Sequence, residues 1–254
     1  MSLTLYNAPQ STCSQRVRFV LNAKRIPFEE KKLDLLEGDQ LKPDYLKLNP
    51  NGVVPTIDHD GAIVIDSAVI MEYLEEIAPA AFTPADPVKR AHMRSHMRFI
   101  DEMPTPAVRI PTFNIAFLPR FQKMTEKEFI AFANSKPLRK EMMLRMGQKG
   151  FPESDMNEAL DRLRRTVVRM DEAIAASGGP WLMGKDITLA DIAVMPVIVR
   201  LDDLRLDHMW ADRPAVADWF SAIRLHPAYR PTYYFGSLLT EKFPWLADTL
   251  ERRA

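Results

Sequence analysis

The feature that most constrains the fold is a change of pattern close to residue 80. Before it, short strand-like apolar runs alternate with helical patterns. After it, apolar residues recur only at helical spacing. The two regions are separated by residues 79–87, which contain three prolines and no periodicity. We therefore expect an α/β domain over residues 1–79, a linker over 80–87 and an all-α domain over 88–254.

The first region has the order strand, helix, strand, two further strands and helix. The expected strands are residues 3–6, 28–33, 54–58 and 62–66, and the expected helices are residues 15–23 and 67–77. Asp60 and Gly61 predict a tight turn between the last two strands. Ser67 is a residue type that caps a helix start. This order is that of a thioredoxin-like domain.

The second region contains no convincing strand. The expected helices are residues 89–103, 124–148, 156–177, 188–201 and 215–225. Gly178, Gly179 and Pro180 end the third of them. Thr188 and Asp191 have the spacing of a capping box, which fixes a helix start and implies nothing about a substrate.

The composition gives no indication of a nucleic-acid or membrane partner. Lys+Arg and Asp+Glu are both 34, so the formal net charge is zero. We expect no membrane-spanning segment and no signal peptide, because no apolar run is long enough and the start lacks a basic stretch. The single cysteine, Cys13, cannot form an internal disulfide, so a cytoplasmic location is expected. The five histidines show no metal-ligand spacing, so no metal is expected.

Ser11, Thr12 and Cys13 lie between the first strand and the first helix. A helix start has unpaired N–H groups and a partial positive charge, so it favours an anion such as a thiolate. A hydroxyl there can donate to a bound sulfur and hold it ionised. The alternative is that these hydroxyls only cap the helix.

Two further segments suggest contacts with a peptide-like ligand. In the segment from Asn51 to Pro55, a cis bond before Pro55 would turn the N–H and C=O of Val54 outward, where they could pair as a strand does. Asp66 and Ser67 stand at a helix start, where Ser67 suits a carboxylate and Asp66 suits an ammonium. An ordinary capped helix is the alternative for this pair.

Taken together and in this order, these motifs resemble the glutathione transferase superfamily over the whole chain. The stretch STCSQRVR is similar to the SSCSxRVR motif of the zeta class. The stretch PADPVKRAHMR and the long helical insert near 104–157 are more similar to the bacterial β-aryl etherase group, whose members cleave aryl ethers with glutathione. The resemblance implies a glutathione-binding thioredoxin-like domain, a helical domain that supplies the second-substrate pocket, and a homodimer.

The resemblance also implies roles for individual residues. Ser11, Thr12 or Cys13 would stand beside the glutathione sulfur, and Asn51, Val53, Val54, Pro55, Asp66 and Ser67 would bind the tripeptide. Among the first three we rank Ser11 first because it is closest to the strand end, Thr12 second, and Cys13 third because a neutral thiol is a weak donor. Many relatives carry Gln or Lys where this chain has Val53, so Lys42, Lys47 or Asn51 would have to replace that contact with the glycyl carboxylate. For Cys13, direct attack on a conjugate, a supporting role and a buried inert thiol all remain open.

The pocket for the second substrate has weaker signals. Phe113 and Phe117, in a proline-interrupted aromatic stretch, and Tyr233 near the end of the chain are candidates for an apolar lining. Arg109 or Arg120 could meet an anionic group. Ordinary helix packing is the alternative for each of them.

The predicted function is a glutathione transferase that directs the thiolate at an apolar, aromatic electrophile, with ether cleavage as the sharper hypothesis. A zeta-like maleylacetoacetate isomerase and a non-catalytic glutathione carrier on the same fold are the alternatives. The expected co-substrate is glutathione, without a metal, and the expected partner is a small hydrophobic compound.

Overall fold

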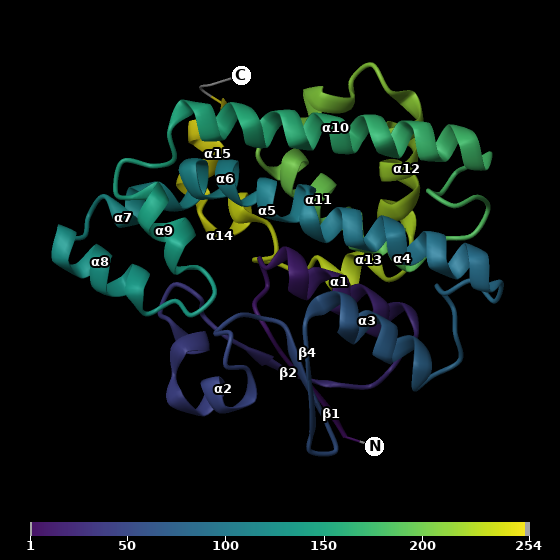
Figure 1. The fold of residues 1–254 in the computed structure, drawn as a ribbon, viewed down its shortest axis with the longest axis horizontal. Helices are drawn as coiled ribbons and strands as arrows, with labels where there is room; N and C mark the ends of the chain where they lie inside the picture. The colour runs from purple at the N-terminus through teal and green to yellow at the C-terminus, as the bar shows by residue number, and fades with distance from the viewer. Residues whose placement is uncertain (1, 252–254) are drawn as a thin grey trace.

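The computed structural model describes residues 2–251 and has the expected fold class. A small mixed sheet with its helices forms one part of the molecule, and a helical array lies against it (Figure 1). We call the part from β1 to α3 the front domain and the part from α4 to α15 the back domain.

The sheet of the front domain has the strand order β2-β1-β3-β4. Its strands are β1 (Leu3–Asn7), β2 (Glu29–Lys32), β3 (Thr56–His59) and β4 (Ala62–Ile65). β1 is parallel to β2 and antiparallel to β3, and β3 pairs with β4 as a hairpin. The turn of the hairpin is the predicted one, because Asp60 and Gly61 both have positive φ, +50° and +90°.

Helix α1 (Thr12–Ala23) connects the two parallel strands and packs against α3 (Ser67–Glu76). Its buried face includes Val17, Phe19, Val20 and Leu21, which join the main core. Between β2 and β3 the chain also forms a short 3-10 turn, η1 (Asp39–Leu41), and helix α2 (Pro43–Leu48), where no regular element was predicted. The start of α1 thus lies next to the end of β1, at the edge of the sheet that faces the back domain (Figure 1).

The prediction that Ser67 caps α3 is wrong, because the cap is Asp66. Asp66 has φ +73°, and its Oδ1 accepts hydrogen bonds from the N–H of Ala68 (2.9 Å) and of Val69 (3.2 Å). A carboxylate reaches these two donors and also carries the negative charge that a helix start favours. Ser67 is therefore the first helical residue and not the cap.

The back domain is helical throughout its described residues. Its longer helices are α4 (Pro87–Glu102), α8 (Glu126–Asn134), α10 (Glu153–Ser177), α11 (Leu189–Asp203), α12 (Pro214–Leu225) and α15 (Pro244–Glu251). Its shorter helices are α5 (Pro104–Ala107), α6 (Arg109–Thr112), a π-helical turn η2 (Phe113–Phe117), α7 (Leu118–Phe121), α9 (Lys140–Met146), a 3-10 turn η3 (Asp207–Trp210), α13 (Tyr229–Thr232) and α14 (Leu239–Lys242). Helix α11 is buried almost along its whole length and packs on both α1 and α4.

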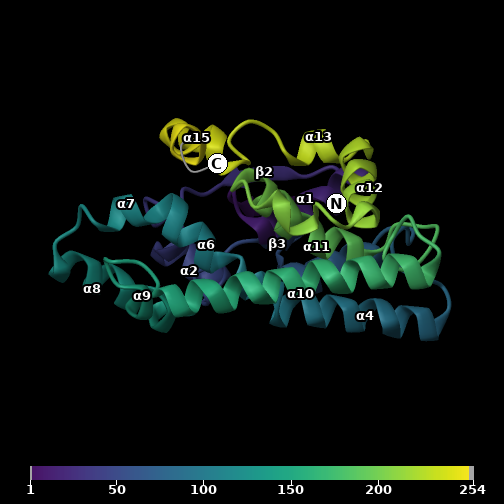
Figure 2. The ribbon, with the colours of Figure 1, turned by 90° about the horizontal axis from the view of Figure 1, so that it is seen from above.

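Residues 124–148 do not form the single helix that their periodicity predicts. They form α8 and α9, separated by residues 135–139. Pro137 is the physical reason, since proline has no N–H to donate and the residue before it disfavours helical dihedral angles. Seen from above, α7, α8 and α9 extend beyond one end of α10 (Figure 2). In Figure 1 they stand over the part of the front domain that contains α2.

The predicted capping box at the start of α11 is present, with Asp191 fully buried. The Asp191 carboxylate accepts hydrogen bonds from the backbone of Thr188 and of Leu182, both at 2.9 Å. The Thr188 hydroxyl and the Trp219 indole also donate to it at 2.9 Å. These four bonds compensate the burial of the carboxylate and fix the start of α11.

No helix in residues 2–251 is both long and apolar enough to span a bilayer. Across the same described residues, His, Cys, Asp and Glu side chains do not gather in groups of three or more that could hold a metal ion.

Candidate functional site

Two connected hollows lie between the domains, at the start of α1. The first, which we call the apolar chamber, is lined by Ser11, Thr12, Phe113, Phe117 and Phe121, among others. The second, which we call the polar chamber, is lined by Asp66, Ser67, Glu72 and Arg94, among others. The residues that line both are Cys13, Val53, Val54, Arg109, Leu138 and Arg139. An elongated ligand can therefore extend from one chamber into the other.

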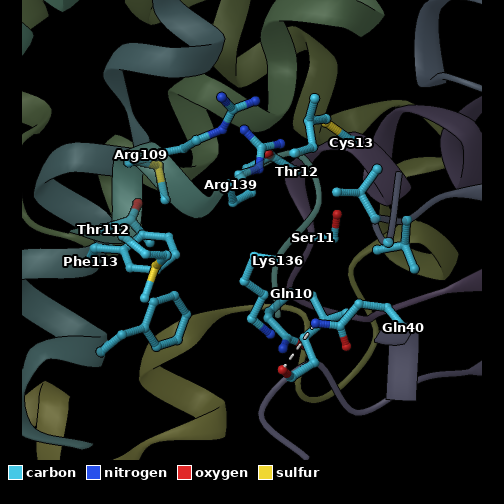
Figure 3. A pocket seen from close by; sticks show the side chains of 18 of the residues that line it. Gln10, Ser11, Thr12, Cys13, Gln40, Arg109, Thr112, Phe113, Lys136 and Arg139 are labelled. Carbon is cyan, nitrogen blue, oxygen red and sulfur yellow. Dashed lines mark hydrogen bonds between the residues drawn. The ribbon is translucent and has the colours of Figure 1, made fainter. Parts of the chain in front are cut away.

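The start of α1 forms one wall of the apolar chamber (Figure 3). Ser11 is the N-cap, and its Oγ accepts a hydrogen bond from Ser14 N at 3.3 Å. An accepting hydroxyl keeps its own hydrogen, so Ser11 is still able to donate to a ligand. Thr12 lines the same chamber, whereas Cys13 stands at the junction of the two.

The segment before β3 presents an unpaired backbone edge at Val54. The Val54–Pro55 peptide bond is cis, as the sequence suggested. The carbonyl of Val53 accepts hydrogen bonds from the Tyr45 hydroxyl (2.6 Å) and from Asn49 Nδ2 (2.9 Å), which hold the segment in place. The N–H and C=O of Val54, by contrast, have no hydrogen-bond partner within residues 2–251. A ligand backbone can pair with them as a strand would.

The start of α3 leaves the N–H of Ser67 free for a ligand. The first four N–H groups of a helix have no partner inside it. Asp66 satisfies those of Ala68 and Val69 with its side chain, and its carbonyl accepts the first intrahelical bond from Ile70 at 2.8 Å. The N–H groups of Asp66 and Ser67 have no partner within residues 2–251, and the Ser67 hydroxyl lies 3.3 Å from Arg16 Nη1. Since Asp66 Oδ2 has no hydrogen bond within the described chain, the pair suits a carboxylate and an ammonium on one carbon.

Arg16 and Arg18 of α1 connect the front domain to the back domain through hydrogen bonds. The sequence analysis missed this role. Both side chains are almost fully buried. Arg16 donates to Ala193 O (2.8 Å), Asp101 Oδ1 (2.6 Å) and Thr105 Oγ1 (2.7 Å), besides its contact with Ser67. The partners of Arg18 are Asn7, Ala8, Pro9, Thr232 and Ser237. The two arginines of the RVR stretch therefore position the site.

Four cations of the back domain line the cleft without a carboxylate partner: Arg98, Arg109, Lys136 and Arg139. Arg98 lines the polar chamber, and Figure 3 shows the other three. The four side chains make no ion pair and no hydrogen bond with another residue of the described range 2–251. Burial and the charge of Arg139 lower the pKa of Arg109 to about 10. Burial and the charge of Arg120 lower the pKa of Lys136 to about 8, and burial also lowers the pKa of Arg139. Their charge favours an anion in the cleft.

Among the residues predicted for the second substrate, Phe113 and Phe117 are in the cleft and Tyr233 is not. The two phenylalanine rings pack edge to face at 5.1 Å between centroids and line the apolar chamber. Tyr233 lines neither chamber. Its ring is partly buried and stacks on Tyr229 at 4.5 Å between centroids, and burial of its hydroxyl raises its pKa well above the usual value. It is therefore a packing residue.

Of the charged residues that the sequence analysis named as candidates, some line the cleft and others do not. Arg109 lines both chambers, whereas Arg120 lies outside them and donates to the carbonyl of Leu36. Lys42 and Lys47 are exposed and paired with aspartates of their own turns, Asp39 and Asp44. Asn51 and Val53 line the apolar chamber. Lys136 and Arg139 were missed because the sequence predicted both inside one continuous helix.

A thioredoxin-like domain joined to a helical domain, with this cleft between them, is the architecture of a glutathione-dependent transferase. The family model "Glutathione S-transferase, N-terminal domain" matches residues 10–77, and "Glutathione S-transferase, C-terminal domain" matches residues 153–222. A probable maleylacetoacetate isomerase of Caenorhabditis elegans is 31% identical over 204 residues, which is 80% of each chain. The chain belongs to the glutathione S-transferase family.

Protein LigF of Sphingobium sp. strain SYK-6 is 29% identical over 242 residues, which is 92% of this chain and 93% of LigF. The crystal structure of LigF, described as a β-etherase, matches with a TM-score of 0.81 and 28% identity, over 92% of this chain and 99% of that one. Residues 78–152 lie outside both family models, yet they supply Phe113, Lys136 and Arg139 to the cleft.

Proposed function

We propose that this protein binds glutathione across the two chambers and directs its thiolate at an electrophilic carbon of an aromatic compound. The main support for this proposal is that three features line the same cleft. These are the free N–H of Ser67 beside Asp66, the unpaired backbone edge of Val54, and the hydroxyls at the start of α1, which open onto a wall of phenylalanines.

In this proposal the γ-glutamyl end lies at Asp66 and Ser67, and the cysteinyl backbone pairs with Val54. The sulfur then lies near Ser11 to Cys13, where a helix start, a donated hydroxyl hydrogen bond and the charges of Arg109 and Arg139 favour the thiolate. Ser11 ranks first as the hydroxyl donor, Thr12 second and Cys13 third, since a thiol is a weak donor.

Ether cleavage is the sharper form of the proposal, because the LigF relative is described as a β-etherase. The thiolate attacks the carbon that carries the ether oxygen, a C–S bond forms and the C–O bond breaks. The aryloxide leaves with the electron pair and takes a proton from solvent, so the products are a glutathione thioether and a phenol. The phenylalanine wall suits the aromatic leaving group.

An isomerase acting on maleylacetoacetate is the second candidate. The 31% identical relative and the unpaired cations Arg109 and Arg139, which suit an anionic substrate, favour it. Incubation of the protein and glutathione with aromatic ethers, aryl halides and maleylacetoacetate decides between them. We expect release of a phenol from an aryl ether; turnover of maleylacetoacetate alone would establish the isomerase, and turnover of none would favour a glutathione carrier.

Replacing Ser67 with alanine is expected to weaken glutathione binding by about 10- to 100-fold. The variant loses a hydroxyl beside the carboxylate site, and one charge-assisted hydrogen bond contributes about 1.5–3 kcal/mol. Calorimetric titration measures the change, with Ser221→Ala, an exposed serine on α12, as the matched control. Equal affinity of Ser67→Ala and the native protein would remove Ser67 from the site.

We also propose a homodimer in the cytoplasm. Ile63 on β4, Val69 on α3 and Val88 on α4 are exposed apolar side chains, which a partner surface would cover. Sedimentation at micromolar concentration is expected to give a species of twice the chain mass of 29.1 kDa. A single species of the chain mass would contradict the dimer.

A further inference from the structure

Residues 135–139, between α8 and α9, form an arm of the back domain that touches the front domain beside Val54. A Cβ added to Gly52 would lie 3.1 Å from Pro137 Cδ, so the arm is in direct contact with the segment that leads to Val54. Gly52 has φ +60°, which a glycine adopts without strain. The arm thus lines the apolar chamber beside Gly52 and Val53.

Lys136 of this arm is a buried cation without a charged partner. Its residue is 7% exposed, and its Nζ lies 4.0 Å from the ring centroid of Phe132. No other described residue bonds to its ammonium. A buried ammonium strongly disfavours its charged form unless an anion pairs with it. The position of Lys136 in the lining of the apolar chamber makes a bound anion the natural partner.

Two buried amides line the same chamber and are also incompletely bonded. Gln10 and Gln40 are 5% and 6% exposed, and the Oε1 atom of each has no hydrogen-bond partner. The amide of Gln10 can present its N–H₂ group instead, because the two orientations have nearly the same shape. Nε2 of Gln40 donates to the carbonyl of Leu35 at 3.5 Å, and its second hydrogen is left for a ligand. Figure 3 shows Gln10, Gln40 and Lys136 on one side of the pocket, across from Phe113. A carboxylate accepts from an ammonium and from amide N–H groups at once.

We propose that Lys136, together with the amides of Gln10 and Gln40, forms a carboxylate subsite that the back-domain arm adds to the cleft. The subsite rests on the proposed function, which places glutathione from Ser67 past Val54. The tripeptide carries a second carboxylate on its glycine, and its chain continues past Val54 toward Gly52 and Gln40. That glycyl carboxylate is the expected occupant. A carboxylate on the second substrate is the other candidate occupant of the subsite.

Lysines of the front domain do not offer this pairing. Lys42 and Lys47 are exposed and lie 2.7 Å and 2.9 Å from Asp39 and Asp44, respectively. Lys42 is therefore a matched control, because the same substitution there removes a lysine charge that already has a carboxylate partner.

The test uses the native protein, Lys136→Met and Lys42→Met, with thermal unfolding to show that each variant folds. The probes are S-methylglutathione, which has no thiol to titrate, and its ethyl ester on the glycyl carboxylate. We expect Lys136→Met to weaken binding of S-methylglutathione by about 10- to 100-fold and to leave binding of the ester unchanged. Lys42→Met should bind both probes as the native protein does.

A second pair of probes, S-benzylglutathione and S-(4-carboxybenzyl)glutathione, separates the two sources of the carboxylate. If Lys136→Met weakens the binding of the carboxybenzyl conjugate only, the carboxylate subsite is confirmed and its occupant is the second substrate. If Lys136→Met binds all four probes as tightly as the native protein, the subsite is overturned while the proposed function stands. If the native protein itself binds none of them, both are overturned.

Discussion

The alanine variant of Ser11 is expected to raise the pKa of the bound glutathione thiol and to reduce turnover at neutral pH by about 10- to 100-fold. The variant removes the hydroxyl that is still free to donate at the start of α1. A free thiol has a pKa of about 8.5, and one charge-assisted hydrogen bond of about 1.5–3 kcal/mol corresponds to one or two pKa units. Affinity for glutathione should change little, because Val54, Asp66 and Ser67 supply most contacts.

The controls separate chemistry from stability. Ser11 is also the cap of α1, so its loss costs about 1 kcal/mol of stability, whereas glycine preserves the cap to within a few tenths. Ser11→Gly should therefore fold like the native protein and still lose the low thiol pKa. Cys13→Ala should change turnover little. If Cys13→Ala abolishes turnover while Ser11→Ala spares it, a cysteine-based thiol exchange replaces the hydroxyl mechanism.

Replacing Arg16 with methionine is expected to lower the free energy of unfolding by about 3–5 kcal/mol. Methionine fills the space, but it leaves Asp101, Thr105 and the carbonyl of Ala193 without the donors that they have in the native protein. Buried polar groups that lose a partner keep the full cost of their desolvation. Because Arg16 also contacts the Ser67 hydroxyl, glutathione affinity should fall in the same variant.

Chemical denaturation measures this loss. Arg94→Met is the matched control, because the Arg94–Glu72 ion pair is exposed and such pairs contribute at most about 1 kcal/mol. Arg16→Lys keeps the charge but cannot reproduce the fork of donors, so it should recover only part of the stability. An Arg16→Met protein that unfolds at the same denaturant concentration as the native protein would show that Arg16 does not hold the domains together.

The sequence correctly predicted turns and helix caps that depend on a few residues close together in the chain. The Asp60–Gly61 turn and the Thr188–Asp191 capping box were both predicted, since each depends on residues next to one another in the chain. The single helix over residues 124–148 was wrong, because apolar periodicity continued across Pro137 while the backbone could not. The α3 cap was misassigned for a related reason: Asp66 and Ser67 are both good caps, and only the backbone angles distinguish them.

Some residues of the candidate site were also suggested by the sequence, and others were not. Ser11 to Cys13, Val54, Asp66 and Ser67 line the chambers, and the sequence suggested them because each stands at the end of a predicted strand or helix. The sequence did not suggest Lys136 and Arg139, because their positions depend on how the arm of residues 135–139 lies against Gly52. Tyr233 was a candidate by its aromatic character alone, and its packing against Tyr229, outside both chambers, could not be read from neighbours in sequence.

The most direct measurement of the central claim is the ultraviolet absorbance of the glutathione thiolate in the complex at neutral pH. We predict a thiolate signal that grows as glutathione is added to the native protein and saturates, and that Ser11→Gly reduces strongly at the same occupancy. Binding detected by calorimetry without any thiolate absorbance would contradict thiol activation and leave a glutathione carrier. The absence of binding would contradict the assignment of the cleft altogether.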